Sequence, residues 1–236
     1  MTTVLVTGGC GFIGGYFVRH LIKETDWRIV NQDKLTYAAD PNRLKDITEG
    51  DRYRFVHGDI SDAALTNEVF RNESPWAVVN FAAESHVDRS IVVAAPFIQA
   101  NVVGTQVLLD AARTYGIGRF VQISTDEVYG DCDGIEPRNE SSILSPSNPY
   151  AASKAAAELL CMAYRRTHGL NVQIIRSCNN YGPGQYPEKL IPLTVRNALS
   201  NKALPIYGNG LQQRDWVYVK DNVQAIHLAL VNGEPN

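Results

Sequence analysis

Short apolar runs recur along the chain and alternate with longer stretches whose apolar positions follow a helical spacing. The runs are rich in valine and isoleucine, which is typical of strands buried on both faces of a parallel sheet. The predicted strands are Val4–Val6, Arg28–Asn31, Arg54–His57, Ala77–Phe81, Arg119–Ile123 and Val172–Ile175. The predicted helices include Ile13–Glu24, Asp62–Arg71, Ala95–Tyr115 and Tyr150–His168. Strands that alternate with helices predict an α/β fold built on a doubly wound parallel sheet.

The pattern changes near Asn180, where prolines at positions 183, 187, 192 and 205 interrupt the apolar runs. We therefore expect residues 1–179 to form the sheet domain with the catalytic residues. Residues 180–236 then begin a smaller C-terminal lobe that binds substrate, with segments that return to the sheet. Prolines break regular elements, so this lobe is expected to consist of loops and short elements.

Charge and composition exclude several classes of protein. The 236 residues include 22 basic and 25 acidic side chains, a formal net charge of −3, and no basic block. This balance argues against a nucleic-acid or membrane-surface partner. We expect neither a secretory signal nor a membrane span. The four scattered cysteines predict reduced thiols in the cytoplasm and no metal site.

A glycine-rich segment directly follows the first predicted strand. Thr7–Gly15 reads TGGCGFIGG and precedes a helical stretch, so Gly8, Gly11 and Gly14 lie at a turn between strand and helix. Such glycines let the backbone approach a pyrophosphate, and the helix N-terminus presents N–H groups to the anion. A tight turn without a ligand also uses glycine. The position after the first strand favours the dinucleotide-binding, or Rossmann, interpretation.

An acidic residue stands where the second strand ends. Asp33 follows Gly14 by nineteen positions and is placed to accept hydrogen bonds from the adenosine ribose. Its carboxylate repels a 2′-phosphate and favours NAD over NADP, although the adjacent Lys34 softens that repulsion. Asp59 and Ile60 follow the third strand. Asp59 either contacts adenine or caps the next helix.

Tyr150 and Lys154 form a YxxxK pair at the start of the predicted helix after residue 148. At this spacing the two side chains share one helix face, and Ser147 or Asn148 can cap the helix. A neighbouring ammonium favours the phenolate of a tyrosine, whose ordinary pKa is near 10. The alternative is an amphipathic surface pair without chemistry. The preceding dinucleotide motif favours a catalytic tyrosine and lysine.

A polar segment follows the fifth predicted strand. Thr125, Asp126 and Glu127 lie at its carboxyl end, where open α/β sheets bind their ligands. Two adjacent carboxylates at such a place favour different pKa values, and hence one acid and one base. Ordinary solvated acids in a loop are the alternative.

These motifs together resemble the extended short-chain dehydrogenase/reductase family, and within it the dehydratases of nucleotide-activated sugars. The resemblance covers essentially the whole chain, in segments that read TGGCGFIGG, DKLTYA, NFAAESHVDRSI, STDEVYG, SNPYAASKAA and NNYGPGQYPEKLIP. The acidic pair Asp126-Glu127 is its most discriminating element, because related 4-epimerases lack it. Family members are longer, so we expect the remainder of the substrate lobe beyond Asn236.

The resemblance implies which residues contact the cofactor and the substrate. The implied NAD contacts are Phe12, Ile13, Asp33, Lys34, Leu35, Thr36, Asp59, Ile60, Ala82, Ala83, Tyr150, Lys154 and Asn180. The implied nucleotide-sugar contacts are Ser85, Thr125, Asn179, Lys189, Leu190, Pro205, Ile206, Tyr207 and Arg214. Lys189 and Arg214 suit a diphosphate, because a guanidinium binds phosphate oxygens bidentately. His86 is interpreted as structural.

The resemblance also implies the reaction. Tyr150 takes the proton of the hexose C4 hydroxyl, Glu127 takes the C5 proton, and Asp126 protonates the departing C6 hydroxyl. The implied substrate is dTDP-glucose, with a UDP-glucose dehydratase or a 4-epimerase as alternatives and a non-catalytic NAD-binding protein as the alternative outside the enzymes. A homodimer packed through the helices at 95–115 and 150–168 is implied as well.

Overall fold

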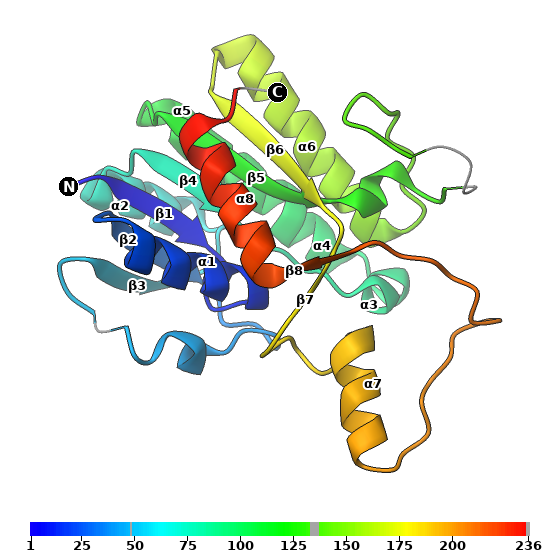
Figure 1. The fold of residues 1–236 in the computed structure, drawn as a ribbon. Coiled ribbons are helices and arrows are strands. Elements are labelled where there is room, and N and C mark those ends of the chain that lie inside the picture. The colour runs from blue at the N-terminus through cyan, green and yellow to red at the C-terminus, as the bar shows by residue number, and fades with distance from the viewer. Residues whose placement is uncertain (48, 133–136, 235–236) are drawn as a thin grey trace.

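The computed structural model describes residues 1–47, 49–132 and 137–234, and its main sheet consists of parallel strands (Figure 1). Their spatial order is β3-β2-β1-β4-β5-β6, which reverses direction between β1 and β4. The strands are β1 (Thr3–Thr7), β2 (Arg28–Asp33), β3 (Tyr53–His57), β4 (Ala77–Asn80), β5 (Arg119–Thr125) and β6 (Val172–Ser177). Each contains or overlaps one predicted strand, so the doubly wound parallel sheet is confirmed. Open sheets of this order bind ligands where the order reverses.

Helices connect the strands and cover both faces of the sheet. They are α1 (Phe12–Glu24), α2 (Ala63–Glu73), α3 (Val87–Val92), α4 (Ala95–Phe97), α5 (Gly104–Thr114), α6 (Pro149–His168), α7 (Leu190–Leu199) and α8 (Val219–Asn232). Shorter elements are η1 (Pro41–Leu44), the π-helical turn η2 (Ile98–Val103) and η3 (Asp126–Tyr129). A second small sheet pairs β7 (Asn179–Tyr181) with β8 (Trp216–Tyr218) in parallel.

Successive strand residues point into two separate apolar layers. Val4 and Val6 of β1 pack with Phe17 of α1 and Ile226 of α8, so α1 and α8 lie side by side on one face (Figure 1). Leu5 points to the opposite face, where α2, α5 and α6 pack. This alternation explains why the strands read as continuous apolar runs: both faces are covered.

The helix predicted for residues 95–115 is interrupted. It consists of α4, the π-helical turn η2 and α5 in direct succession. Asn101, in η2, has a buried side chain that accepts from the backbone N–H of Glu84 at 2.9 Å and donates to its carbonyl at 3.0 Å. It also donates to Ser153 Oγ of α6 at 2.8 Å. Asn101 makes these tertiary contacts from the π-helical turn. The helical spacing of apolar residues gives no information about them.

The segment after β7 leaves the sheet and then returns. Helix α7 contributes no buried residue and, with residues 200–215, extends away from the sheet (Figure 1). Helix α8 then packs on α1 and belongs to the core. The segment predicted as a lobe at 180–236 therefore contains an outer part, with α7, and a helix, α8, that packs on the main sheet domain. Residues 235–236 lie outside the described residues.

Two observations bear on the surroundings of the protein. No helix within the described ranges is long and apolar enough to cross a membrane. All four cysteines are free thiols, and Cys10 and Cys161 are buried.

Candidate active site

The glycine loop joins β1 to α1 at the carboxyl edge of the sheet. Gly8 has a φ of +71°, and a Cβ there would lie 2.7 Å from the backbone nitrogen of Ala82. A Cβ on Gly14 would lie 2.3 Å from the Gly8 carbonyl oxygen. Among the described residues no side chain caps α1 at Gly11, so the first N–H groups of the helix can face an anion. The loop therefore fits the pyrophosphate of a dinucleotide.

Asp33, the last residue of β2, is hydrogen-bonded to this loop. Its carboxylate accepts the backbone N–H groups of Cys10 and Leu35, each at 2.8 Å. Burial raises the pKa of Asp33, and these two hydrogen bonds oppose the shift. Lys34 does not face Asp33 as a free charge, because its ammonium pairs with Asp59 at 2.6 Å. The repulsion between Asp33 and a 2′-phosphate is consequently less softened by Lys34 than the sequence suggested.

The start of α2 decides whether Asp59 caps this helix. The cap of this helix is Asp62, whose carboxylate accepts the N–H of Leu65 at 3.1 Å. Asp59 lies before it, pairs with Lys34 and accepts the N–H of Ser61 at 2.9 Å. The helix-cap interpretation of Asp59 is therefore wrong, and a contact with adenine stays a prediction.

Two buried asparagines behind the glycine loop were missed by the sequence analysis. Asn31 accepts the N–H of Gly9 at 3.0 Å and thereby attaches the loop to β2. Asn80 accepts from the hydroxyl of Thr7 at 2.6 Å and attaches the end of β1 to β4. Both follow apolar residues near the carboxyl ends of their strands, and this polar residue in an otherwise apolar run is the signal that could have found them.

Tyr150 and Lys154 both lie buried in the first turns of α6. Asn148, not Ser147, caps this helix by accepting the N–H of Ala151 at 2.9 Å. Lys154 Nζ donates to the carbonyl of Ile123 in β5 at 2.5 Å. Burial lowers the pKa of Lys154 to about 8. The lysine is thus held against the end of the strand that carries the acidic pair.

The pKa of Tyr150 differs from the sequence-based expectation. Burial and the negative charges of Glu127 and Asp126 raise it, and a hydrogen bond with Thr125 opposes that rise. The expected lowering by a neighbouring ammonium is wrong for this arrangement. The physical reason is that burial disfavours the charged phenolate most strongly, and the charges of the two acids act in the same direction.

Thr125, Asp126 and Glu127 occupy the end of β5 and the first turn of η3. The Thr125 hydroxyl accepts the N–H of Glu127 at 3.2 Å and donates to Asp126 Oδ1 at 3.2 Å. Burial raises the pKa of both acids, and the charge of Asp126 raises that of Glu127 further. Two half-buried neighbouring carboxylates hold a proton more readily than isolated ones do, so one can act as an acid while the other is ionised.

The far wall of the cleft comes from the segment before α7. Lys189 Nζ donates to the carbonyl of Ser85 at 3.0 Å. Its neighbour Glu188 accepts from the Tyr37 hydroxyl at 3.1 Å and lies 3.4 Å from His86 Nε2. These contacts join the segment before α7 to the loops after β2 and β4. Glu188 was missed by the sequence analysis, and His86 has a structural contact there.

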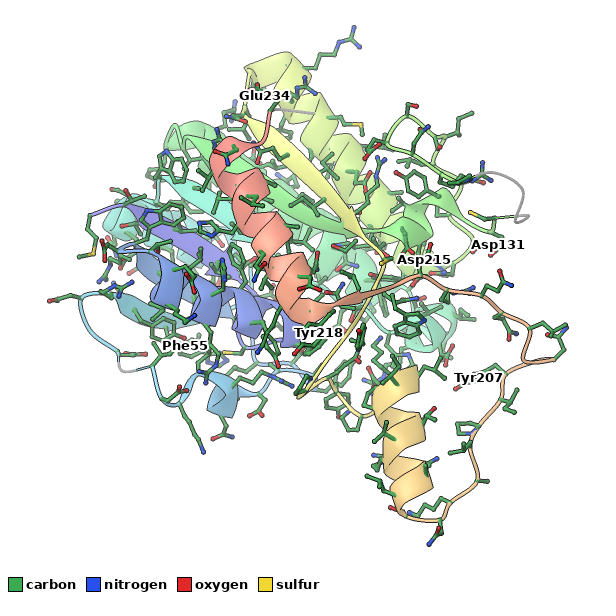
Figure 2. The ribbon with its side chains drawn as sticks, in the orientation of Figure 1. Phe55, Asp131, Tyr207, Asp215, Tyr218 and Glu234 are labelled. Atoms are coloured by element: carbon green, nitrogen blue, oxygen red, sulfur yellow. The ribbon has the colours of Figure 1, made fainter. Side chains whose placement is uncertain are left out.

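An open cleft of about 2410 Å³ runs along the carboxyl edge of the sheet and gathers most of the predicted residues. Figure 2 labels Asp131, Tyr207 and Asp215 on this side of the molecule. The predicted residues that line it are Gly8, Gly11, Phe12, Ile13, Gly14, Asp33, Lys34, Thr36, Asp59, Ile60, Ala82, Ala83, Ser85, Thr125, Asp126, Glu127, Tyr150, Lys154, Asn179, Asn180, Lys189, Leu190, Tyr207 and Arg214. Leu35, Pro205 and Ile206 do not line it, and their contacts with ligands stay predictions.

A further residue at the cleft was also missed. Ser124 immediately precedes Thr125 and lines the cleft. Its buried hydroxyl is among the side-chain oxygens without a hydrogen-bond partner within the part of the chain that the structure describes. A hydroxyl in this state is available to a ligand, and its position at the end of β5 is the signal that could have found it.

A parallel sheet of this order, a glycine loop at its reversal point and a buried tyrosine–lysine pair define the class of protein as a dinucleotide-binding enzyme of the Rossmann type. The chain belongs to the NAD dependent epimerase/dehydratase family, whose model matches residues 4–236. The structural resemblance to the short-chain dehydrogenase/reductase fold is thereby confirmed.

Individual relatives agree in sequence and in fold. A dTDP-glucose 4,6-dehydratase of Salmonella typhimurium is 49% identical over 249 residues, an alignment that covers 98% of this chain and 69% of the relative. The low-salt glycan biosynthesis protein Agl12 of Haloferax volcanii is 50% identical, in an alignment that covers 98% of this chain and 74% of Agl12. The crystal structure of DesIV, a dTDP-glucose 4,6-dehydratase of Streptomyces venezuelae solved with NAD bound, superposes with a TM-score of 0.94 at 50% identity. That match covers 99% of this chain and 73% of DesIV.

Proposed function

We propose that this protein catalyses the 4,6-dehydration of dTDP-glucose to the 4-keto-6-deoxy sugar and water. The observation that carries the proposal is the pair Asp126-Glu127, half-buried in one cleft with Tyr150 and Lys154. A tyrosine and a lysine alone suit oxidation of a carbinol, which epimerases also perform. The acid and base beside them add the means to remove water. Relatives at 46–50% identity that carry the dehydratase name support this reading.

Tyr150 acts first, as the base toward the C4 hydroxyl of the hexose. Its hydrogen bond with Thr125 is the contact that opposes the upward shift of its pKa. Thr125 also stands beside the acidic pair, so the same hydroxyl positions the sugar at both stages. Lys154 holds its ammonium within reach of the end of β5 and contributes positive charge below its pKa of about 8.

Glu127 and Asp126 perform the elimination. Once C4 is a ketone, the proton at C5 is acidic and Glu127 takes it. Asp126 donates a proton to the C6 hydroxyl, which leaves as water. The raised pKa of Asp126 supports the protonated role, because the proton must be present before the step begins. Glu127 returns a proton to C5 at the end.

The residues of the glycine loop fit NAD, since a Cβ at Gly8 or Gly14 would fill the cradle. When bound, NAD would supply reversible hydride acceptance, the redox chemistry needed at C4 and C6 of the sugar. Asp33 would hold the adenosine ribose with lone pairs that its two backbone hydrogen bonds leave available. Lys189 and Arg214 would hold the substrate diphosphate, and Tyr207 the nucleotide base.

The same interpretation includes a homodimer and a cytoplasmic location. The helices implied for the interface carry exposed apolar side chains at Ile98, Leu159 and Met162. Such side chains on two helices that pack against each other support an interface between copies. Free thiols at all four cysteines support a reducing compartment. Light scattering on the purified protein measures the oligomeric state directly.

The test is a substrate panel. The full chain is incubated with NAD and dTDP-, UDP- or GDP-hexoses, and the products are analysed by NMR. Loss of the C6 oxygen with a new C4 ketone supports dehydration, and the best donor identifies the nucleotide. Inversion at C4 with C6 intact would instead mark a 4-epimerase. No conversion of any hexose would favour the non-catalytic alternative.

A further inference from the structure

Asn148 connects the start of α6 to the acidic pair. Its side-chain oxygen accepts the N–H of Ala151 at 2.9 Å, which caps the helix. Its side-chain nitrogen donates to Glu127 Oε2 at 3.1 Å. The cap requires an acceptor toward the N–H group, so the orientation of the amide is fixed by chemistry and its NH₂ must face Glu127.

This contact makes the two oxygens of the Glu127 carboxylate different in their hydrogen bonding. Oε2 accepts from Asn148, while no hydrogen bond to Oε1 is found in residues 1–47, 49–132 and 137–234. One oxygen is therefore anchored and the other is left for a reacting proton. The anchor is itself held firmly, because Asn148 is fixed to the backbone of the helix that carries Tyr150.

Several charges face Glu127 from other elements. Asp126, on the same segment, raises its pKa, whereas Lys189 and Arg214 on the substrate side lower it. Tyr150 of α6 lies close enough for the charge of Glu127 to affect its own pKa. Among the contacts that favour the ionised carboxylate, the hydrogen bond from Asn148 is the largest. An amide has no charge to lose, so this support persists at every pH.

We propose that Asn148 is a positioning residue for the elimination step: it anchors Oε2 of Glu127 and directs Oε1 toward the C5 proton. The inference rests on the proposed function, in which Glu127 is the base. It assigns the residue before Pro149 a second task in addition to capping. The start of α6 and the base are thereby fixed relative to each other by one side chain.

Two substitutions separate the two tasks. Asn148→Ser and Asn148→Asp both retain an oxygen that can cap the helix. The serine hydroxyl takes the place of the amide carbon and lies farther from Glu127 than the amide nitrogen does, and an aspartate carboxylate has no hydrogen to donate. Asn148→Ala removes both the cap and the donor. As a matched control, Asp62→Ser changes the cap of α2 in the same manner and leaves the acidic pair untouched. Thermal unfolding reports whether each variant keeps its stability.

The direct readout is the titration of the Glu127 carboxyl by ¹³C NMR in the protein with NAD, assigned by its loss in Glu127→Gln. We expect the midpoint to rise by about one pH unit in Asn148→Ser, because a hydrogen bond to a charged group is lost. Asn148→Asp should raise it further by repulsion, and Asp62→Ser should not move it. The acid limb of the elimination rate should move by the same amount, with C4 oxidation unchanged.

An unchanged midpoint in Asn148→Ser and Asn148→Asp would overturn the proposal, and a shift confined to Asn148→Ala would assign Asn148 to the helix cap alone. The titration does not depend on turnover. If the unaltered protein forms no 4-keto-6-deoxy sugar, the proposed function fails while the NMR result still decides whether Asn148 holds Glu127.

Discussion

The ion pair behind the acidic segment allows the effect of a substitution to be worked out from the structure. Arg176 of β6 donates to both carboxylate oxygens of Glu158 in α6, with Nε at 3.1 and 3.0 Å and Nη2 at 2.6 Å. The Glu158 side chain is 0% exposed and that of Arg176 is 10% exposed. Arg176 also donates to the Tyr129 hydroxyl of η3 at 2.8 Å. The pair therefore supports the segment that carries Asp126 and Glu127.

Arg176→Met leaves the Glu158 carboxylate buried without its partner. We expect a loss of about 3–5 kcal/mol in the free energy of unfolding, which lowers Tm by roughly 6–20 °C in a chain of this size. Replacing both partners, as Arg176→Met with Glu158→Leu, removes the buried charge and should recover much of the loss. The assays are urea unfolding and thermal unfolding followed by circular dichroism.

The surface pair of Arg113 and Asp110 provides the control. Its atoms are 3.9 Å apart and its side chains are 50% and 40% exposed, so Arg113→Met should cost under about 1 kcal/mol. The reasoning is refuted if Arg176→Met is no more destabilising than Arg113→Met. It is refuted equally if the double substitution is less stable than Arg176→Met alone.

Three further predictions follow from the site. Asp126→Asn should spare C4 oxidation and slow elimination by about 10²–10⁴-fold, measured by stopped-flow absorbance of the reduced cofactor; unchanged product formation would contradict the role of Asp126. Burial lowers the pKa of Lys154 to about 8 from 10.5, so the native state is penalised below pH 8 and the penalty fades as pH rises to 10.5. Lys154→Met should therefore stabilise the protein by about 1–3 kcal/mol at pH 7, with a gain that shrinks toward pH 10 in thermal unfolding scans, and a constant gain would count against this origin. Asp59→Asn removes the charge paired with Lys34. The ratio of the NADP and NAD dissociation constants should fall by up to about fivefold in fluorescence titrations. An unaltered ratio would show that Lys34 has no influence on the choice of cofactor.

The local pattern of apolar and polar residues was sufficient to predict the strands of the sheet and the sequence motifs, because both depend on short stretches of the chain. The apolar run at 119–123 predicted β5, yet the strand continues through Thr125. The extension comes from pairing with Arg176 and Ser177 in β6, which local sequence cannot reveal. Likewise, the YxxxK spacing predicted one helix face for Tyr150 and Lys154, and both are buried in α6.

The features that the sequence did not disclose are those that depend on contacts between distant segments. The break in the helix at 98–103 lies where Asn101 bonds to Glu84 and Ser153, residues 17 and 52 positions away. Glu188 contacts Tyr37, 151 positions earlier. Spacing within a motif places residues on a common face, but such links appear only when the chain is folded.

The packing of α8 on α1 has a consequence for synthesis of the protein. Val223, Ile226 and Leu230 of α8 cover the same apolar layer as Phe17 and Leu21 of α1, although these residues are about 200 positions apart. At ribosomal speeds of about 5–20 residues per second, α1 emerges roughly 10–40 s before the helix that covers it. During that interval one face of the nascent sheet remains open to water and to other chains. The apolar face of α1 is therefore covered only after α8 has left the ribosome, so the order of synthesis delays completion of this layer.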